Sequence, residues 1–237
     1  MIDPDGRVVM VSGASRGIGR AVATVLHAKG YTVSAGARDR VKLSTALTPI
    51  DDDRLLIARY EAADRQSHTD WVDATIERFG RIDALVNNAG TTNRFSIEAG
   101  DEAELDALWT TNLKGPLFLT RACLPHLRAS GSGRVVNIGS LSGKRVRNDD
   151  IAYGASKFAL MALTHGTRRI AWDDGVRATA LCPSFVATDL TAAVTKVSRA
   201  EMIDPDDLAE LAATLIALPN TASVAEMLVN CRLEDTL

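Results

Sequence analysis

Three side chains with complementary acid–base chemistry stand at a spacing that lets them act together. Tyr153 and Lys157 are four residues apart in the segment YGASK, and Ser140 precedes the tyrosine by thirteen positions. Four residues make about one helical turn, so the phenol and the ammonium share one face of a helix. An ammonium beside a phenol favours the phenolate and brings a group with an ordinary pKa of about 10 towards working pH. The spacing predicts a proton donor and acceptor, with the Ser140 hydroxyl fixing the same substrate oxygen.

A glycine-rich turn supplies the second chemical feature. The segment SGASRGIG at positions 12–19 follows an apolar run of strand length and precedes an amphipathic helical pattern. Glycine permits a tight turn and a close approach of the backbone to a pyrophosphate, and the unpaired amides of the first helical turn point at the anion. The turn therefore predicts a dinucleotide site. Its candidate residues are Gly13, Ser15, Arg16, Gly17, Ile18 and Gly19.

The end of the second predicted strand indicates which dinucleotide binds. It reads AGAR at positions 35–38 and has no acidic residue where an NAD site uses a carboxylate to bind the ribose. Small residues followed by Arg38, with Arg16 inside the turn, leave room and positive charge for a 2′-phosphate. NADP is therefore the preferred cofactor. Asp39 keeps NAD as the alternative, because a shift of one residue would bring a carboxylate to the ribose.

Strand-length apolar runs alternate with stretches of helical period along the whole chain, which is typical of βαβ units around a parallel sheet. The predicted strands cover 7–12, 31–36, 54–60, 82–87, 134–138, 176–181 and 227–230. The predicted helices cover about 18–29, 67–79, 101–113, 116–129, 151–172 and 205–218. Right-handed crossovers then predict an α/β fold with a doubly wound parallel sheet of about seven strands. Helices cover both faces, and the ligand crevice lies at the carboxyl ends of the strands.

These segments resemble those of the short-chain dehydrogenase/reductase family. The resemblance runs from about position 7 to position 188 and is carried by the glycine turn, by NNAG at 87–90, and by Asn112, Ser140, Tyr153 and Lys157 in family order. It implies an NAD(P)-dependent oxidoreductase that interconverts a carbonyl and a secondary alcohol by hydride transfer. It also implies a single Rossmann-type domain over 1–237, with a substrate-loop region at about 184–202.

The resemblance implies a role for each matched residue. Tyr153 would be the general acid in carbonyl reduction and the base in alcohol oxidation, and Ser140 would orient the substrate. Lys157 would also bind the nicotinamide ribose, and Asn112 would hold a water that links Lys157 to solvent. Further cofactor contacts would come from Asn88, Ala89 and Gly90 at the adenosine ribose, and from Pro183, Val186 and Thr188 of the segment PSFVAT near the nicotinamide carboxamide.

The chain departs from the family pattern at several positions. Ser12 stands where the family usually has threonine, and Ser184 replaces the glycine after Pro183. Glu61, a candidate cofactor contact, falls where an aspartate commonly meets the adenine amine, and the nearby Asp64 is a candidate helix cap. The C-terminal segment VNCRLE at 229–234 loosely resembles members that act on 3-hydroxy acids or serine-like compounds, which is the alternative substrate class.

Composition excludes other classes of function. The 27 Lys and Arg against 30 Asp and Glu give a net charge of −3, which supplies no broad basic surface for nucleic acid or anionic lipid. Three cysteines without CxxC pairs and four scattered histidines predict neither a disulfide framework nor a metal site. No secretory leader and no membrane-length apolar run is visible, so we expect a cytoplasmic protein.

Other readings of the same fold stay open. A cofactor-binding sensor or scaffold that turns nothing over would use the same glycine turn, although it would not need Asn112, Ser140, Tyr153 and Lys157 together. A sugar-nucleotide epimerase is disfavoured, because little chain follows position 188 for a separate substrate domain. Family members commonly pair through two long central helices, which predicts a homodimer or homotetramer through 116–129 and 151–172.

Overall fold

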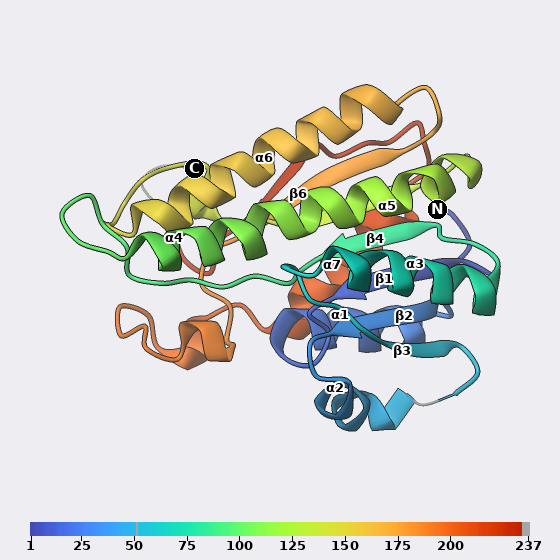
Figure 1. Cartoon of the computed structure of the whole chain (residues 1–237), viewed down its shortest axis with the longest axis horizontal. Helices are drawn as coiled ribbons and strands as arrows, with labels where there is room; N and C mark the ends of the chain where they lie inside the picture. The colour runs from blue at the N-terminus through green and yellow to red at the C-terminus, as the bar shows by residue number, and fades with distance from the viewer. Residues whose placement is uncertain (51, 234–237) are drawn as a thin grey trace.

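The computed structural model describes residues 1–50 and 52–233 and contains one seven-stranded parallel sheet with helices on both faces (Figure 1). The strand order is β3-β2-β1-β4-β5-β6-β7. The strands are β1 (Val8–Ser12), β2 (Thr32–Ala37), β3 (Leu55–Arg59), β4 (Ala84–Asn87), β5 (Arg134–Ile138), β6 (Arg177–Pro183) and β7 (Glu226–Val229). The predicted doubly wound α/β fold is confirmed.

The order of the strands reverses between β1 and β4, and open parallel α/β sheets bind their ligands at such a reversal. Successive strands run outward from β1 through β2 to β3, and then from β4 to β7 on the other side. In register, Ser12 pairs with Gly36, and Val11 pairs with Val86, so the carboxyl ends of β2, β1 and β4 lie next to one another. Connections that diverge from neighbouring strands leave a ligand crevice between them.

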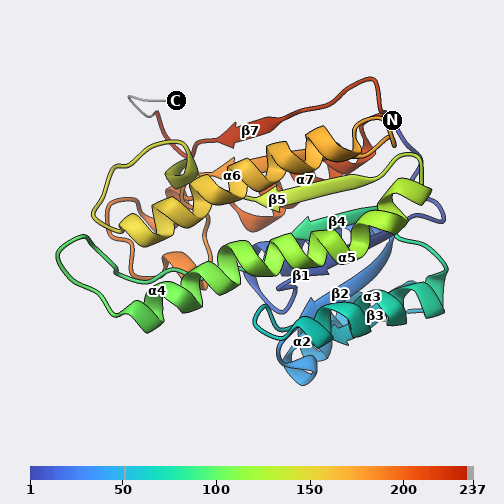
Figure 2. The ribbon, with the colours of Figure 1, turned by 45° about the horizontal axis from the view of Figure 1, so that its top comes forward.

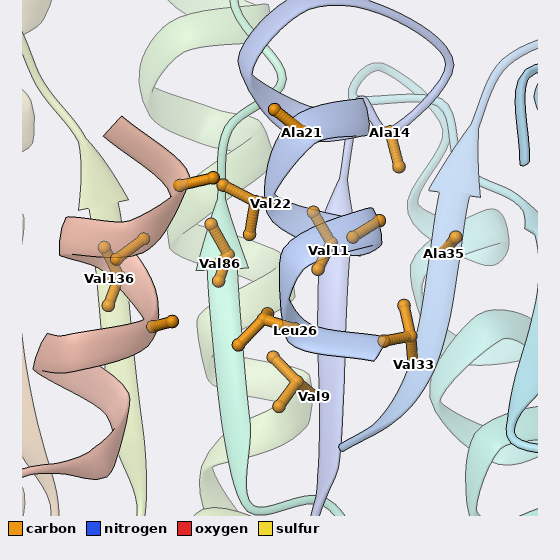
Figure 3. Close-up of a cluster of buried hydrophobic side chains, with 14 of the residues drawn as sticks. Val9, Val11, Ala14, Ala21, Val22, Leu26, Val33, Ala35, Val86 and Val136 are labelled. Atoms are coloured by element: carbon orange, nitrogen blue, oxygen red, sulfur yellow. The ribbon is translucent and has the colours of Figure 1, made fainter. Parts of the chain in front are cut away.

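Two layers of helices cover the sheet. One layer is α1 (Gly17–Ala28), α2 (Arg40–Leu47) and α7 (Pro205–Ala217); the other is α3 (Arg65–Phe79), α4 (Glu102–Trp109), α5 (Gly115–Ala129) and α6 (Ile151–Ala171). Figure 2 shows α5 and α6 side by side over the sheet, with β7 at its outer edge. In Figure 3 the side chains of Val22 and Leu26 of α1 face Val9, Val11 and Val86 of the sheet. Burial of such apolar area is the main stabilising contribution, at roughly 25 cal/mol per Å².

Aspartate caps begin four of the helices. The side chains of Asp39, Asp64, Asp101 and Asp204 accept hydrogen bonds from the first amides of α2, α3, α4 and α7. These bonds satisfy amides that have no intrahelical acceptor. The predicted capping role of Asp64 is confirmed. Helix α1 has no such cap: its first turn contains no acidic residue, and the side chain of its N-cap, Arg16, makes no capping bond.

Two features of the fold differ from the sequence prediction. Helix α2 was not predicted, because only Leu43 and Leu47 of its residues are buried, and one pair gives too weak a periodic signal. The stretches predicted as separate helices at 101–113 and 116–129 are joined by a π-helical turn, Thr110–Lys114. Pro116 suggested a new helix start, but the widened turn accommodates its ring and missing N–H within one continuous run. Other predicted bounds differ from the observed ones by a few residues.

Candidate active site

The candidate catalytic residues lie at the carboxyl edge of the sheet. Ser140 follows β5 and begins the 3₁₀ turn η3 (Leu141–Gly143), while Tyr153 and Lys157 belong to the first two turns of α6. Gly143 packs so closely on α6 that a Cβ atom there would lie 2.8 Å from the Lys157 carbonyl oxygen. Figure 1 shows the chain after β4 and after β6 leaving the sheet on the same side of the molecule. These loops surround the edge where the three side chains meet.

Ser140 lies beside the Tyr153 hydroxyl, close enough for hydrogen bonding between the two side chains to act on the pKa of the phenol. The Ser140 Oγ also accepts from the Ser142 amide at 3.1 Å. The Lys157 Nζ lies 5.7 Å from the centre of the Tyr153 ring and donates to the Ile138 carbonyl at 2.8 Å. The structure therefore brings the hydroxyl, the phenol and the amine together, as the spacing predicts. Such a set can deliver a proton to an oxygen bound between Ser140 and Tyr153.

Burial dominates the ionisation of this pair. It raises the pKa of Tyr153, and the hydrogen bond with Ser140 opposes the rise without cancelling it. Burial also lowers the pKa of Lys157 to about 8. The expectation that Lys157 draws the phenol pKa towards neutrality is wrong for the free protein, because desolvation of the buried phenol raises its pKa. At neutral pH the phenol is protonated, which is the form that donates a proton.

Asn112 lies in the π-helical turn between α4 and α5. Its side chain is buried and hydrogen-bonded: the Nδ2 donates to the Thr91 carbonyl at 2.9 Å and to the Ser156 Oγ at 3.1 Å, while the Oδ1 accepts from the Thr91 amide at 2.9 Å. Pro116 has no N–H, so the α-helical bond from residue 116 to the Asn112 carbonyl cannot form. π-helical turns of this kind are frequent at functional sites.

The NNAG segment connects the catalytic edge to the glycine turn. A Cβ at Gly90 would lie 3.5 Å from the Asn112 Oδ1 and 3.9 Å from the Lys157 Nζ. Asn88 donates from its Nδ2 to the carbonyls of Ser12 and Gly13 at 2.9 and 3.2 Å. The Ser12 Oγ accepts from the amides of Asn88 and Ala89 at 3.0 and 3.1 Å. The serine that replaces the family threonine thus makes the hydroxyl contacts that hold this segment.

The glycine turn forms a cradle that side chains would fill. Gly13 has a φ of +68°, and a Cβ there would lie 2.9 Å from the Ala89 Cα. Gly17 has a φ of +53°, and its Cβ would lie 3.1 Å from the Thr188 Cγ2. Both positions require the left-handed backbone that glycine tolerates. Together with the uncapped amides of α1, this cradle fits the pyrophosphate of a dinucleotide, and Ser15, Ile18 and Gly19 lie in the same turn.

The adenosine end of the crevice carries exposed positive charge. Arg38 follows β2 and is exposed, and Arg16 is exposed at the start of α1. The Asp39 carboxylate is turned to α2, where its Oδ1 accepts from the amides of Val41 and Lys42 at 3.0 Å each. A carboxylate used as a helix cap is not directed at a ribose at the end of β2. Exposed guanidinium groups of this kind can bind phosphate.

Two further groups of predicted contacts lie around the crevice. Glu61 follows β3, with its carbonyl held by the Ser67 Oγ at 3.2 Å and the His68 Nε2 at 3.0 Å. Pro183 ends β6, and Val186 and Thr188 follow in the segment that touches Gly17.

Sequence reasoning missed two residues that support the site. Ser156 is buried, accepts from Asn112, and donates to the Tyr153 carbonyl at 2.8 Å. Its position three residues after Tyr153 was the available signal. The Cys182 thiol is buried beneath Ser140, whose amide donates to it, and burial raises the pKa of this thiol to about 11. Nothing in the local pattern marks Cys182, because its contact depends on the pairing of β5 with β6.

The described residues contain neither a cluster that could hold a metal ion nor a helix that could span a membrane. In the ranges 1–50 and 52–233, no group of three or more His, Cys, Asp or Glu side chains is placed to hold a metal ion. No helix in these ranges combines the length and apolar character needed to cross a membrane.

Comparison with known proteins identifies similar chains. The family model described as short chain dehydrogenase matches residues 7–198. An agropine synthesis reductase of Rhizobium rhizogenes is 44% identical over 229 residues, which are 96% of this chain and 53% of that protein. A second agropine synthesis reductase of the same organism is also covered to 53%, so the chain spans about half the length of these curated relatives.

Solved structures agree with the fold. A 3-ketoacyl-(acyl-carrier-protein) reductase from Brucella melitensis, complexed with NADH, is 26% identical, with a TM-score of 0.89 over 96% of this chain and 98% of its own. A metagenomic short-chain oxidoreductase, complexed with NADP, is 31% identical, with a TM-score of 0.83 over 98% of this chain and 100% of its own. Nicotinamide dinucleotides are thus bound on this fold in both forms.

Proposed function

Because the chain belongs to the short chain dehydrogenase family and is therefore an oxidoreductase, we propose that it interconverts a carbonyl and a secondary alcohol with a nicotinamide dinucleotide. The observation that carries this proposal is the contact of Ser140 with Tyr153 beside Lys157, at the sheet edge that also holds the glycine cradle. A sensor or scaffold would have no use for this acid–base set. The proposed substrate loop is the segment 184–202, within a single domain.

In the proposed mechanism the bound nicotinamide supplies or accepts the hydride. The chain's own residues handle the oxygen and the proton. Ser140 donates a hydrogen bond to the substrate carbonyl oxygen, and Tyr153 transfers its phenolic proton to that oxygen as hydride reaches the carbon, so that C=O becomes CH–OH. In the oxidation direction the Tyr153 oxygen takes the proton back.

Lys157 and Asn112 have supporting roles in this proposal. A pKa of about 8 lets Lys157 exchange a proton near neutral pH, so it can restore the Tyr153 proton after each reduction. The Asn112 turn and Gly90 border the Lys157 Nζ, where a water held by Asn112 would connect the amine to solvent. Lys157 and Thr188 would also hold the nicotinamide end, with Asn88, Ala89 and Gly90 at the ribose.

The reaction class is tested by a turnover panel. Purified protein is incubated with NADPH or NADH and with ketones, sugars, steroids, 3-oxo and 3-hydroxy acids, and compounds of agropine synthesis, a choice suggested by the named relatives. We expect cofactor-dependent change in nicotinamide absorbance with at least one carbonyl or alcohol. Tight dinucleotide binding without turnover of any compound would favour the sensor alternative.

We propose NADP as the preferred cofactor, supported by exposed Arg38 and by the use of Asp39 as a helix cap. Wild-type protein is expected to bind NADPH more tightly than NADH. Arg38→Ala should weaken NADPH binding about 10-fold, since a charge-assisted bond contributes roughly 1.5–3 kcal/mol, partly screened here, and should leave NADH within two-fold. Fluorescence titration measures both dissociation constants. Arg40→Ala, at the first residue of α2, is the matched control, and tighter NADH binding would refute the preference.

Exposed apolar side chains on α6 support a proposal on assembly. Phe158, Ile170 and Trp172 are exposed in α6 or directly after it, although they are large apolar side chains. Such residues are enriched where protein surfaces associate. We propose that two copies pair through α5 and α6, as a dimer or as part of a tetramer.

Free cysteines at positions 123, 182 and 231 are consistent with a reducing compartment, and we propose the cytoplasm.

A further inference from the structure

An ion pair joins the glycine turn to the segment that follows β6. The Arg16 NH1 lies 3.0 Å from the Asp189 Oδ2, across a separation of 173 positions in the sequence. Arg16 is the N-cap of α1, and Asp189 is the first residue of the 3₁₀ turn η4 (Asp189–Thr191). Both side chains are about 70% exposed, so a ligand can reach either of them.

The ion pair lies where the two sides of the crevice already touch. Thr188, directly before Asp189, approaches Gly17 to within 3.1 Å of the position of a Cβ. The segment around Thr188 is also held to the rest of the fold, because the Ala187 amide donates to the Ile203 carbonyl at 2.9 Å. Arg199 is engaged by the carbonyls of Ala187 and Thr188 at 3.1 and 3.3 Å. The Asp189 carboxylate is therefore held beside the amides that would bind a pyrophosphate.

We propose that Asp189 limits the preference for NADP over NAD by holding Arg16 away from a 2′-phosphate. The inference rests on the proposed dinucleotide binding and adds to it a residue that opposes NADP. In this proposal the Arg16 guanidinium that pairs with Asp189 turns away from the carboxylate to bind a phosphate on the adenosine ribose. NADP recruits this guanidinium, whereas NAD leaves the ion pair intact.

The charges of Arg16, Asp189 and the phosphate indicate whether Asp189 strengthens or weakens NADP binding. A phosphate dianion with three acceptor oxygens attracts a guanidinium more strongly than one exposed carboxylate does. When Arg16 turns to the phosphate, however, Asp189 loses its cation and faces the negative pyrophosphate, which is unfavourable. Asp189 thus weakens NADP binding in two ways and NAD binding in neither. Removing its charge should increase the preference for NADP.

The expected change in the NADPH dissociation constant follows from the exposure of the Arg16–Asp189 ion pair. Exposed ion pairs contribute about 0.2–1 kcal/mol, which corresponds to a change of roughly 1.5- to 5-fold in an equilibrium constant. Asp189→Asn, which keeps the shape of the side chain, should therefore lower the dissociation constant for NADPH about two- to five-fold. The constant for NADH should change by less than 1.5-fold. Because the pair is screened by salt, the effect should shrink at about 1 M ionic strength.

The experiment is a fluorescence titration of the full chain with NADPH and with NADH at low salt. Wild type, Asp189→Asn, Arg16→Ala and the double variant form a thermodynamic cycle. If Asp189 acts through Arg16, then Asp189→Asn will shift the NADPH-to-NADH ratio in wild type and not in the Arg16→Ala background. Asp174→Asn is the matched control for charge, since Asp174 pairs with Arg128 at 2.7 Å, outside the crevice.

The titration distinguishes failure of the Asp189 proposal from failure of the proposed function. If both cofactors bind and Asp189→Asn leaves their ratio unchanged, the specificity role of Asp189 is overturned while the proposed function stands. The same holds if the shift persists without Arg16, because a general loss of negative charge then explains it. Binding of neither cofactor to wild type would overturn the proposed function, and this inference with it.

Discussion

Replacement of Tyr153 by phenylalanine is expected to remove turnover while dinucleotide binding stays within a few fold of wild type. The change deletes one oxygen, the atom that contacts Ser140 and carries the transferred proton. Positioned general acids contribute about 10²- to 10⁴-fold, so kcat should fall by that range. The ring itself remains packed beside Lys157, so the shape of the crevice is preserved.

Three measurements separate an effect on the chemical step from effects on cofactor binding and on the stability of the fold. Single-turnover rates with the best compound of the panel report the chemical step, fluorescence titration reports NADPH binding, and urea unfolding reports stability. Tyr31→Phe is the matched control: Tyr31 is buried directly before β2, away from the carboxyl edge, and its hydroxyl has no hydrogen-bond partner among the described residues. Turnover retained by Tyr153→Phe, or lost equally in Tyr31→Phe, would contradict the assigned role.

The arrangement of the candidate catalytic residues could be predicted from sequence because its geometry is mostly local. Tyr153 and Lys157 share a helix, so their spacing alone places them on one face. Ser140 required one further step, that β5 ends beside the start of α6, and this follows from the βαβ order. The glycine turn was recognisable because the strand before it and the helix after it both carry strong patterns.

Other features depend on contacts between distant parts of the chain, which periodicity does not encode. Burial of the Tyr153 phenol raises its pKa, opposite to the direction that the spacing predicts, and the Lys157 amine donates to the Ile138 carbonyl. The pairing of Arg16 with Asp189 depends on how the segment after β6 folds back on α1. The π-helical turn at Asn112 was invisible because Pro116 is equally typical of a helix start.

Replacement of Lys157 by methionine is expected to stabilise the fold and inactivate the enzyme. Burial lowers the pKa of Lys157 from its ordinary 10.5 to about 8, so at pH 7 the folded protein carries a desolvated ammonium. That lowering corresponds to at most roughly 3 kcal/mol, and loss of the bond to the Ile138 carbonyl removes about 1 kcal/mol of stabilisation. Methionine fills a similar volume without charge. We expect the free energy of unfolding at pH 7 to rise by about 1–2 kcal/mol.

The stability difference between Lys157→Met and wild type should depend on pH, because Lys157 has different pKa values in the folded and unfolded states. Below pH 8 the amine is protonated in both states, and the burial penalty is complete. Between pH 8 and 10.5 the folded state has lost the proton and the unfolded state still binds it, so wild-type stability rises with pH in this window. Lys157→Met lacks this rise, so its advantage should shrink between pH 7 and 9.5. Urea unfolding at both pH values measures the difference.

Activity should change in the opposite direction, because the same ammonium is proposed to hold the nicotinamide ribose and to restore the Tyr153 proton. NADPH binding should weaken by about 10-fold, on the order of one charge-assisted hydrogen bond, and turnover should be lost. Lys29→Met is the matched control, since Lys29 is 43% exposed and pairs with Glu210 at 2.8 Å on the opposite helical layer. A less stable Lys157→Met at pH 7 would mean that the bond to the Ile138 carbonyl outweighs desolvation. The buried amine would then be part of what holds α6 against β5, and its retention would no longer require a catalytic reason.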